Sequence, residues 1–121
     1  METFSKARKI RPPKKIVLSE MEKKIKEPWS PVAVAELNNI FSVRMARFLG
    51  EFKRWHFHAN EDEFFLVLDG EIVIQTEFGN VELKKGEGTI IHRGVRHCSK
   101  SDNGATVLLI ERTETKTAGE V

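Results

Sequence analysis

From Val32 onward, the chain is a series of short apolar runs separated by residues that favour tight turns. The seven runs are four to ten residues long, and glycine, asparagine or aspartate stands in most of the gaps between them. Many short strands with frequent turns are typical of an antiparallel sandwich or barrel, so the sequence predicts an all-β fold. The runs lie at residues 32–37, 40–49, 52–58, 63–68, 71–76, 89–92 and 105–112.

The pair Asp69-Gly70 gives the clearest turn signal, because a type I′ hairpin turn needs positive φ at both central residues. A hairpin here pairs residues at equal distances on its two sides. One face then carries Glu63 together with four apolar side chains, which we interpret as the floor of a ligand pocket, with ordinary barrel packing as the alternative for the deeper ones. These four candidates are Phe65, Val67, Ile72 and Ile74.

The first thirty residues follow a different pattern. Residues 1–26 hold nine Lys or Arg against three Glu, and no aromatic side chain lies among the basic ones to stack on bases, which argues against nucleic-acid binding. Ser19 and Glu22 form a capping-box pattern, and Pro28 stops the helix, so a short helix is expected over residues 20–27.

At 121 residues the chain has the size of one domain. We expect a basic arm at 1–15, a short helix and linker at 16–31, a β-barrel at 32–113 and a tail at 114–121. No apolar stretch reaches the length of a signal or spanning helix, and a single Cys98 makes no internal disulfide. We therefore expect a cytoplasmic protein without a membrane segment.

All four histidines lie between positions 56 and 97. The strand period of two places His56 and His58 on one face, where two imidazoles can chelate an ion. Glu63 opens an apolar run and needs a partner there, which a cation would supply. His97 follows a turn far along the chain, as expected where a barrel brings distant strands around one ion.

These residues resemble the two motifs of the cupin superfamily. The first motif is complete: Gly50, five residues, His56-Phe57-His58, four residues, Glu63, six residues and Gly70. The second contains Gly86, Gly94 and His97 at the family spacing, with His92 and Ser101 where cupins usually have Pro and Asn. The fifteen residues between the motifs are similar to the shortest spacers, which are typical of small single-domain microbial cupins.

The resemblance implies a jelly-roll-like cupin barrel that holds one divalent transition metal through His56, His58, Glu63 and His97. Three imidazoles and a carboxylate suit Fe, Mn, Ni, Cu, Co or Zn. It also implies a homodimer, since cupins commonly pair through apolar outer surfaces. His92 has two interpretations, a residue near the bound ligand or an exposed turn residue, and the second is favoured.

Three functions remain open at this point. The first is a metal-dependent enzyme acting on a small organic molecule, of the dioxygenase, decarboxylase or isomerase type. The second is a non-catalytic module that binds or senses a small molecule, with the metal organising its pocket. The third is a purely structural metal in a scaffold protein.

Overall fold

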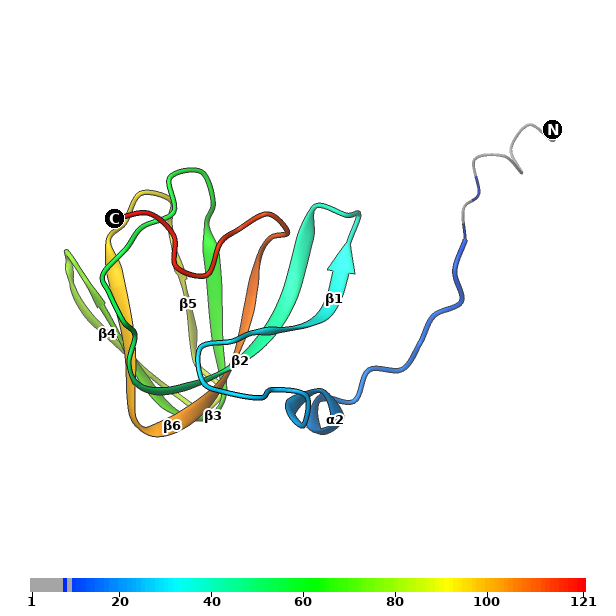
Figure 1. The fold of residues 1–121 in the computed structure, drawn as a ribbon, viewed down its shortest axis with the longest axis horizontal. Coiled ribbons are helices and arrows are strands. Elements are labelled where there is room, and N and C mark those ends of the chain that lie inside the picture. The colour runs from blue at the N-terminus through cyan, green and yellow to red at the C-terminus, as the bar shows by residue number, and fades with distance from the viewer. Residues whose placement is uncertain (1–7, 9) are drawn as a thin grey trace.

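The computed structural model describes Arg8 and residues 10–121, and most of them lie in six antiparallel strands (Figure 1). One short helix, α2, precedes the strands. The strands are β1 to β6, and they alternate with tight turns as the sequence pattern predicts. The bounds are α2 Leu18–Glu22, β1 Val32–Leu37, β2 Phe41–Glu51, β3 Glu63–Thr76, β4 Gly79–Lys84, β5 Gly88–Ile91 and β6 His97–Arg112.

The strands form one sheet in the order β1-β2-β6-β3-β4, and β5 pairs with β3. The two longest strands, β3 and β6, bend so that each takes part in both halves of the fold (Figure 1). The result is a jelly-roll-like barrel whose sheet is not closed. The all-β prediction is therefore confirmed, and one end of the barrel opens towards the segment between β2 and β3.

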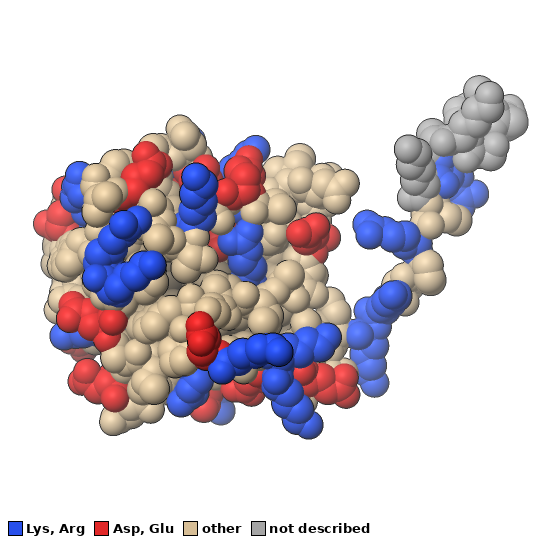
Figure 2. Space-filling view, in the orientation of Figure 1, with Lys and Arg blue, Asp and Glu red and all other residues tan. Residues whose placement is uncertain are grey.

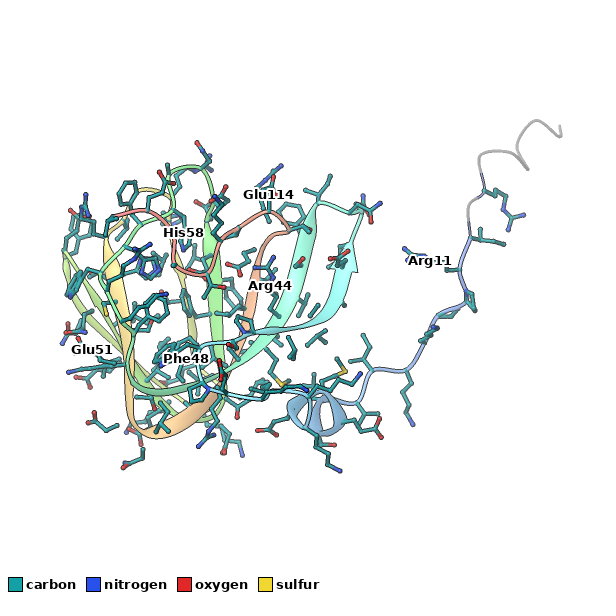
Figure 3. The ribbon with its side chains drawn as sticks, viewed as in Figure 1. Arg11, Arg44, Phe48, Glu51, His58 and Glu114 are labelled. Carbon is teal, nitrogen blue, oxygen red and sulfur yellow. The ribbon has the colours of Figure 1, made fainter. Side chains whose placement is uncertain are left out.

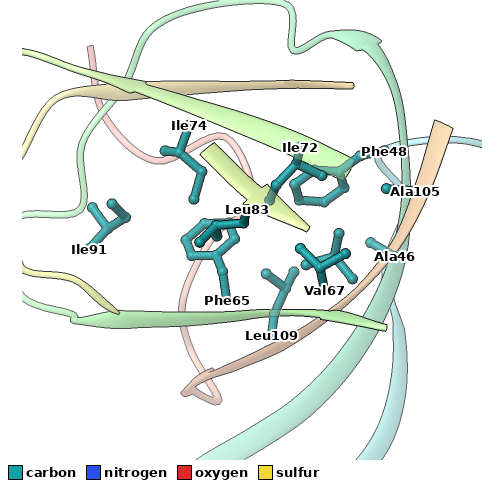
Figure 4. Close-up of a cluster of buried hydrophobic side chains, with 11 residues drawn as sticks. Ala46, Phe48, Phe65, Val67, Ile72, Ile74, Leu83, Ile91, Ala105 and Leu109 are labelled. Atoms are coloured by element: carbon teal, nitrogen blue, oxygen red, sulfur yellow. The ribbon is translucent and has the colours of Figure 1, made fainter. Parts of the chain in front are cut away.

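The hydrophobic core fills the inside of this barrel (Figure 4). Inward positions alternate with outward ones along each strand, as the period of two requires. Side chains from β2, β3, β4, β5 and β6 meet there, and Val67, Ile74 and Val107 are completely buried. The core members are Ala46, Phe48, Phe65, Val67, Ile72, Ile74, Leu83, Ile91, Ala105, Val107 and Leu109.

The predicted hairpin at Asp69-Gly70 is wrong, because β3 runs through both residues. Asp69 pairs with Thr106 and Gly70 pairs with Ala105, with register shifts on either side. Gly70 has a φ of 82°, as in a glycine-containing β-bulge, whereas Asp69 lacks the positive φ that a type I′ turn needs at both residues. Because of the register shifts around Gly70, side chains on both sides of it point into the barrel. The four predicted floor residues therefore still share one side. The turn that reverses the chain lies instead at 77–78, between β3 and β4.

Two further local predictions are wrong. Residues 52–58 form no continuous strand and contribute only isolated bridges, from His56 to His97 and from Phe57 to Glu120. The helix is shorter than expected and Val17 is its N-cap, without a side-chain capping bond. Glu22 does not complete a capping box, because its carboxylate accepts a 2.7 Å hydrogen bond from Thr106 on β6.

Part of the predicted basic arm, residues 1–7 and Lys9, lies outside the described residues. Arg8 and residues 10–15 have no regular secondary structure and extend from the body with exposed Lys and Arg side chains (Figure 2). Within the described part of the chain, no helix is long and apolar enough to cross a membrane.

Candidate metal centre

Three histidines and one glutamate meet near the open end of the barrel. His56 and His58 come from the segment after β2, Glu63 begins β3, and His97 begins β6. Each of the four is at most 6% exposed. One ligand atom from each of the three histidines can be chosen so that all lie within 4.8 Å of one another.

Backbone carbonyls fix the orientation of two of the imidazoles. Nδ1 of His56 lies 3.3 Å from the Arg54 carbonyl oxygen, and Nδ1 of His97 lies 2.9 Å from that of Val95. A carbonyl can only accept a hydrogen bond, so in both rings Nδ1 carries the proton and donates it. The lone pair of a neutral ring is then on Nε2, which is the arrangement that a metal-binding histidine needs.

Glu63 faces the other two imidazoles of this group. Its Oε1 lies 3.4 Å from Nε2 of His58 and 3.6 Å from Nε2 of His97. Both Oε1 of Glu63 and Nε2 of His58 are buried without a hydrogen-bond partner among the described residues. Buried polar atoms without partners are costly, and a bound cation would satisfy both of them.

The donor set suits a transition metal. Two donors that each lie about 2.1 Å from one ion are separated by roughly 3 to 4.2 Å, which brackets the distances from Glu63 to His58 and His97. Three neutral nitrogens and one carboxylate oxygen match the preferences of Zn, Fe, Mn, Co, Ni and Cu better than those of Ca or Mg. The residues therefore fit a single divalent transition ion.

A second carboxyl group, that of Glu111, lies behind Glu63. The two residues are paired across β3 and β6, and Arg44 donates a 2.9 Å hydrogen bond to Oε1 of Glu111. Burial and the nearby charge of Glu63 raise the pKa of Glu111 to about 9. Burial acts in the same direction on Glu63, but His58, His97 and Glu111 outweigh it and lower its pKa. Glu63 is thus the ionised member of the pair.

The pKa values of the two neighbouring histidines, His56 and His58, are shifted in opposite directions. Burial, together with the charge of His97, lowers the pKa of His56 to about 4. Burial also lowers that of His58, yet its contact with Glu63 more than offsets this, so the pKa of His58 is raised. In the absence of a metal, His56 is therefore neutral at pH 7. His58 binds a proton more readily than an ordinary histidine, and a metal ion would have to displace that proton.

A small apolar cavity adjoins the cluster, and the chain from Trp29 to Pro31 covers it from outside. Its volume is about 30 Å³, room for about two water molecules. Trp29 packs on Phe48 and Phe52, with ring centroids 4.5 and 5.2 Å apart. The remaining walls come from β2, the segment between β2 and β3, β3, β6 and the C-terminal tail. The lining residues are Trp29, Pro31, Ala46, Phe48, Phe52, His56, Glu63, Phe65, His97, Ser99, Leu109 and Thr117.

The candidate pocket residues from the sequence lie in different places. Phe65 lines the cavity, whereas Val67, Ile72 and Ile74 lie in the hydrophobic core. The His92 side chain is 73% exposed and lies 3.9 Å from Asp62, outside the cavity lining.

Sequence reasoning missed Glu111, Trp29 and Thr117. Glu111 carried a usable signal, since it is a charged residue that ends the apolar run from Ala105. Trp29 and Thr117 lie far outside the predicted motifs, so no local pattern marks them as neighbours of the site.

Known proteins share this architecture. The cupin domain family matches residues 49–111. The uncharacterized protein YdbB of Bacillus subtilis (strain 168) is 33% identical over 96 residues, covering 77% of this chain and 81% of YdbB.

Solved structures of other proteins share the fold of this chain. A cupin-2 domain containing protein from Shewanella frigidimarina is 31% identical with a TM-score of 0.76, covering 80% of this chain and 93% of the other. Protein NMB1881 from Neisseria meningitidis is 26% identical with a TM-score of 0.73, covering 83% and 100% of the respective chains. Hydroquinone 1,2-dioxygenase PnpCD, in complex with Cd²⁺ and 4-hydroxybenzonitrile, shares the fold at 18% identity, with a TM-score of 0.67 and coverage of 88% and 76%. With its matched motifs, its fold and its buried histidine cluster, the chain belongs to the cupin family.

Proposed function

We propose that this cupin binds one divalent transition metal through His56, His58, Glu63 and His97 and acts as a metal-dependent enzyme on a small organic molecule. One observation carries the proposal: Nε2 of His58 and Oε1 of Glu63 face each other, buried and without another hydrogen-bond partner in the described part of the chain. Without a metal these two atoms are satisfied only when His58 carries a proton, and a bound transition ion would replace that proton and satisfy both atoms.

The ion would supply a Lewis acid or an oxygen-activating centre. His56 and His97 orient their Nε2 lone pairs through the carbonyls of Arg54 and Val95. Phe65 and the other apolar walls exclude water and favour the apolar part of a substrate. A polar group of that substrate would then face the ion. Dioxygenation, decarboxylation and isomerisation are the reaction classes to be tested first.

A non-catalytic binding or sensing module is the second candidate, and the small size of the cavity limits a ligand of this module as much as a substrate of the enzyme. At about 30 Å³, the space beside the ligand set is well below the volume of an ordinary substrate pocket, roughly 300 Å³ or more. In this function the metal organises the pocket and the ligand is held without being converted.

The first experiment measures the metal content of the full chain, produced in metal-replete medium without affinity histidines. We expect about one transition ion per chain, and a strong loss in His58→Ala and His97→Ala. His92→Ala is the matched control, because it removes the only exposed histidine and should retain the metal. A metal content near zero in the parent chain would overturn the proposal.

The second experiment separates the enzyme from the binding module. Each metal-loaded form is incubated with phenols, diketones, keto acids and sugars, and both product formation and melting temperature are followed. Turnover supports the enzyme, whereas a compound that raises the melting temperature without being consumed supports the module. A structural metal would give neither effect and would show no exchangeable water in solvent relaxation of the Mn or Cu form.

A further inference from the structure

The last residues of the chain cross the open end of the barrel beside the candidate metal centre. Figures 1 and 3 show this segment, in red, passing the segment between β2 and β3 that carries His58. We name residues 113–120 the C-terminal strap. Its two ends are held by different groups, and neither cupin motif includes it.

Arg44 and the backbone of Ile40 hold the start of the strap. The guanidinium of Arg44 donates to the carbonyl oxygens of Thr113 at 2.6 Å and Thr115 at 3.1 Å. The Thr113 amide donates to the Ile40 carbonyl at 2.8 Å. The same guanidinium donates a hydrogen bond to Glu111, which lies behind Glu63. The start of the strap is therefore fixed to the polar groups behind the proposed ligands.

The end of the strap pairs with the segment that carries two proposed ligands. Phe57 and Glu120 exchange two backbone hydrogen bonds, of 2.8 and 2.7 Å, and the Glu120 carboxylate accepts a third, of 3.1 Å, from the Ala59 amide. On the other side, His56 and His97 exchange two backbone bonds of 3.0 and 2.8 Å. The His56–His58 segment thus lies between β6 and the strap, and without the strap it would be paired on one side only.

Gly119 places the strap directly against both imidazoles. A methyl group added at Gly119 would lie 2.7 Å from Cδ2 of His56 and 3.1 Å from Cε1 of His58, and 2.6 Å from the Phe57 carbonyl oxygen. Real methyl groups do not approach other atoms so closely, so a side chain here must push the rings or the strap away. Only a residue without a side chain at position 119 therefore leaves the strap and the two rings in their present positions.

Thr117 lies between the metal-side cavity and a larger hollow outside it. The outer hollow has a volume of about 280 Å³, close to the lower limit of roughly 300 Å³ for small-molecule pockets. Three residues line both spaces: Trp29, Phe52 and Thr117. The two spaces therefore adjoin each other at these three side chains.

We propose that the C-terminal strap is part of the metal centre, with Gly119 as a positioning residue for His56 and His58 and Thr117 as part of the entrance from the outer hollow. This inference rests on the proposed metal site. The two motifs supply the proposed ligands, and the strap covers a side of the site that the motif residues leave open. Its residues act on the rings and on access, and they provide no ligand to the ion.

The test of Gly119 compares two glycine substitutions in the full chain. Gly119→Ala should weaken Co²⁺ affinity by about 10- to 100-fold, as substitutions behind metal ligands commonly do, and should alter the visible spectrum of the Co²⁺ form. Gly86→Ala is the matched control, because Gly86 also has positive φ but an added methyl group meets nothing within 4 Å. Equal Co²⁺ affinity in the two variants would overturn the role of Gly119.

A measurement on the parent chain covers the case in which Gly119→Ala fails to fold. In NMR spectra of the Co²⁺ form, the resonances of Gly119 should be shifted strongly, and more than those of Gly86. Unshifted Gly119 resonances in a chain that binds Co²⁺ would overturn the inference. A parent chain that binds no transition metal would instead overturn the proposed function, so the two failures are distinguishable.

The test of the entrance follows the rate at which dipicolinate removes Co²⁺ from the loaded protein. Thr117→Ala should accelerate removal several-fold and Thr117→Trp should slow it, because the first widens the passage and the second narrows it. Lys116→Ala is the control, since Lys116 is exposed on the same strap and lines neither space. Identical rates in all variants would overturn the role of Thr117.

Discussion

At the scale of single residues, the centre depends on which ring nitrogens carry protons. His58 is the ligand whose protonation competes most directly with a metal, because Glu63 stabilises its charged form and raises its pKa above 6.5. The metal-free chain therefore holds a proton on His58 more readily than on an ordinary histidine. A metal ligand must be deprotonated, so binding has to release that proton.

We expect the binding of Co²⁺ at pH 6.5 to be accompanied by a net release of protons, because the pKa of His58 is raised and the ion must displace its proton. Calorimetric titrations in two buffers with different ionisation enthalpies measure this release directly. Equal binding enthalpies in the two buffers would contradict the expected protonation of His58.

Glu111 gives the metal-free protein a pH-dependent stability. Its pKa is about 9 in the folded state and about 4.5 in the unfolded chain, so between these values the unfolded state binds fewer protons. The free energy of unfolding therefore falls as pH rises, by at most about 1.4 kcal/mol per pH unit for this group. His56 acts in the opposite direction, but only between pH 4 and 6.5.

Urea denaturation of the metal-free chain at several pH values from 6.5 to 9 tests this prediction. The free energy of unfolding should decrease over this range, and Glu111→Gln should make the decrease smaller. His58 contributes in the same direction, so some decrease should remain. Glu114→Gln is the control, because Glu114 is exposed and its pKa is lowered, below the tested range. An unchanged slope in Glu111→Gln would contradict the raised pKa.

At the scale of elements, the break in β3 at Gly70 keeps both halves of the strand directed inward. An added methyl group at Gly70 would overlap the Gly104 carbonyl oxygen and lie 2.9 Å from Cα of Ala105, and the residue also has positive φ. Backbone of a paired strand cannot move aside as a flexible side chain can. The break thus depends on glycine for its conformation and for its close approach to β6.

Gly70→Ala should lower the free energy of unfolding by about 2 kcal/mol or more, because it adds a backbone clash to the strain of positive φ. Gly86→Ala separates the two causes, since Gly86 has φ 84°, close to the 82° of Gly70, but open space around it. Urea denaturation measures both variants. Similar losses of stability in the two would show that strain alone decides the effect.

At the scale of the whole molecule, the outer face of the sheet carries a continuous apolar surface. Directly paired residues extend it across β2, β6, β3 and β5, through Val43, Ile110, Phe64 and Ile90. The bond between Glu22 and Thr106 places α2 on the same side of the sheet, yet Ile90 remains 47% exposed. Apolar surfaces of this kind commonly mark interfaces, so a homodimer through this face remains our prediction.

Light scattering coupled to gel filtration should give the mass of a dimer for the parent chain. Ile90→Lys should shift it towards monomer, because a charge would be buried at the interface. Phe78→Lys is the control, since Phe78 is 83% exposed in the turn between β3 and β4, away from this face. A monomeric parent chain would contradict the prediction.

The sequence by itself determined the features that depend on short-range periodicity. Alternation predicted an all-β fold, and it placed His56 and His58 together on the buried side even though their segment forms only isolated bridges. The motif spacing pointed to Glu63 and His97 as their partners. The Asp69-Gly70 pair predicted positive φ at both residues, but only Gly70 has it, and positive φ at a single glycine is also found in β-bulges, so the predicted type I′ turn was wrong.

Only the tertiary structure decided which distant groups surround the candidate site. Pairing between β3 and β6 brings Glu111 behind Glu63, and the N-terminal segment brings Trp29 over the cavity. The strap brings Gly119 against the histidine rings from more than sixty positions away. Such contacts result from strand register and from the paths of connecting segments, which depend on packing over the whole chain and leave no periodic signal in the sequence.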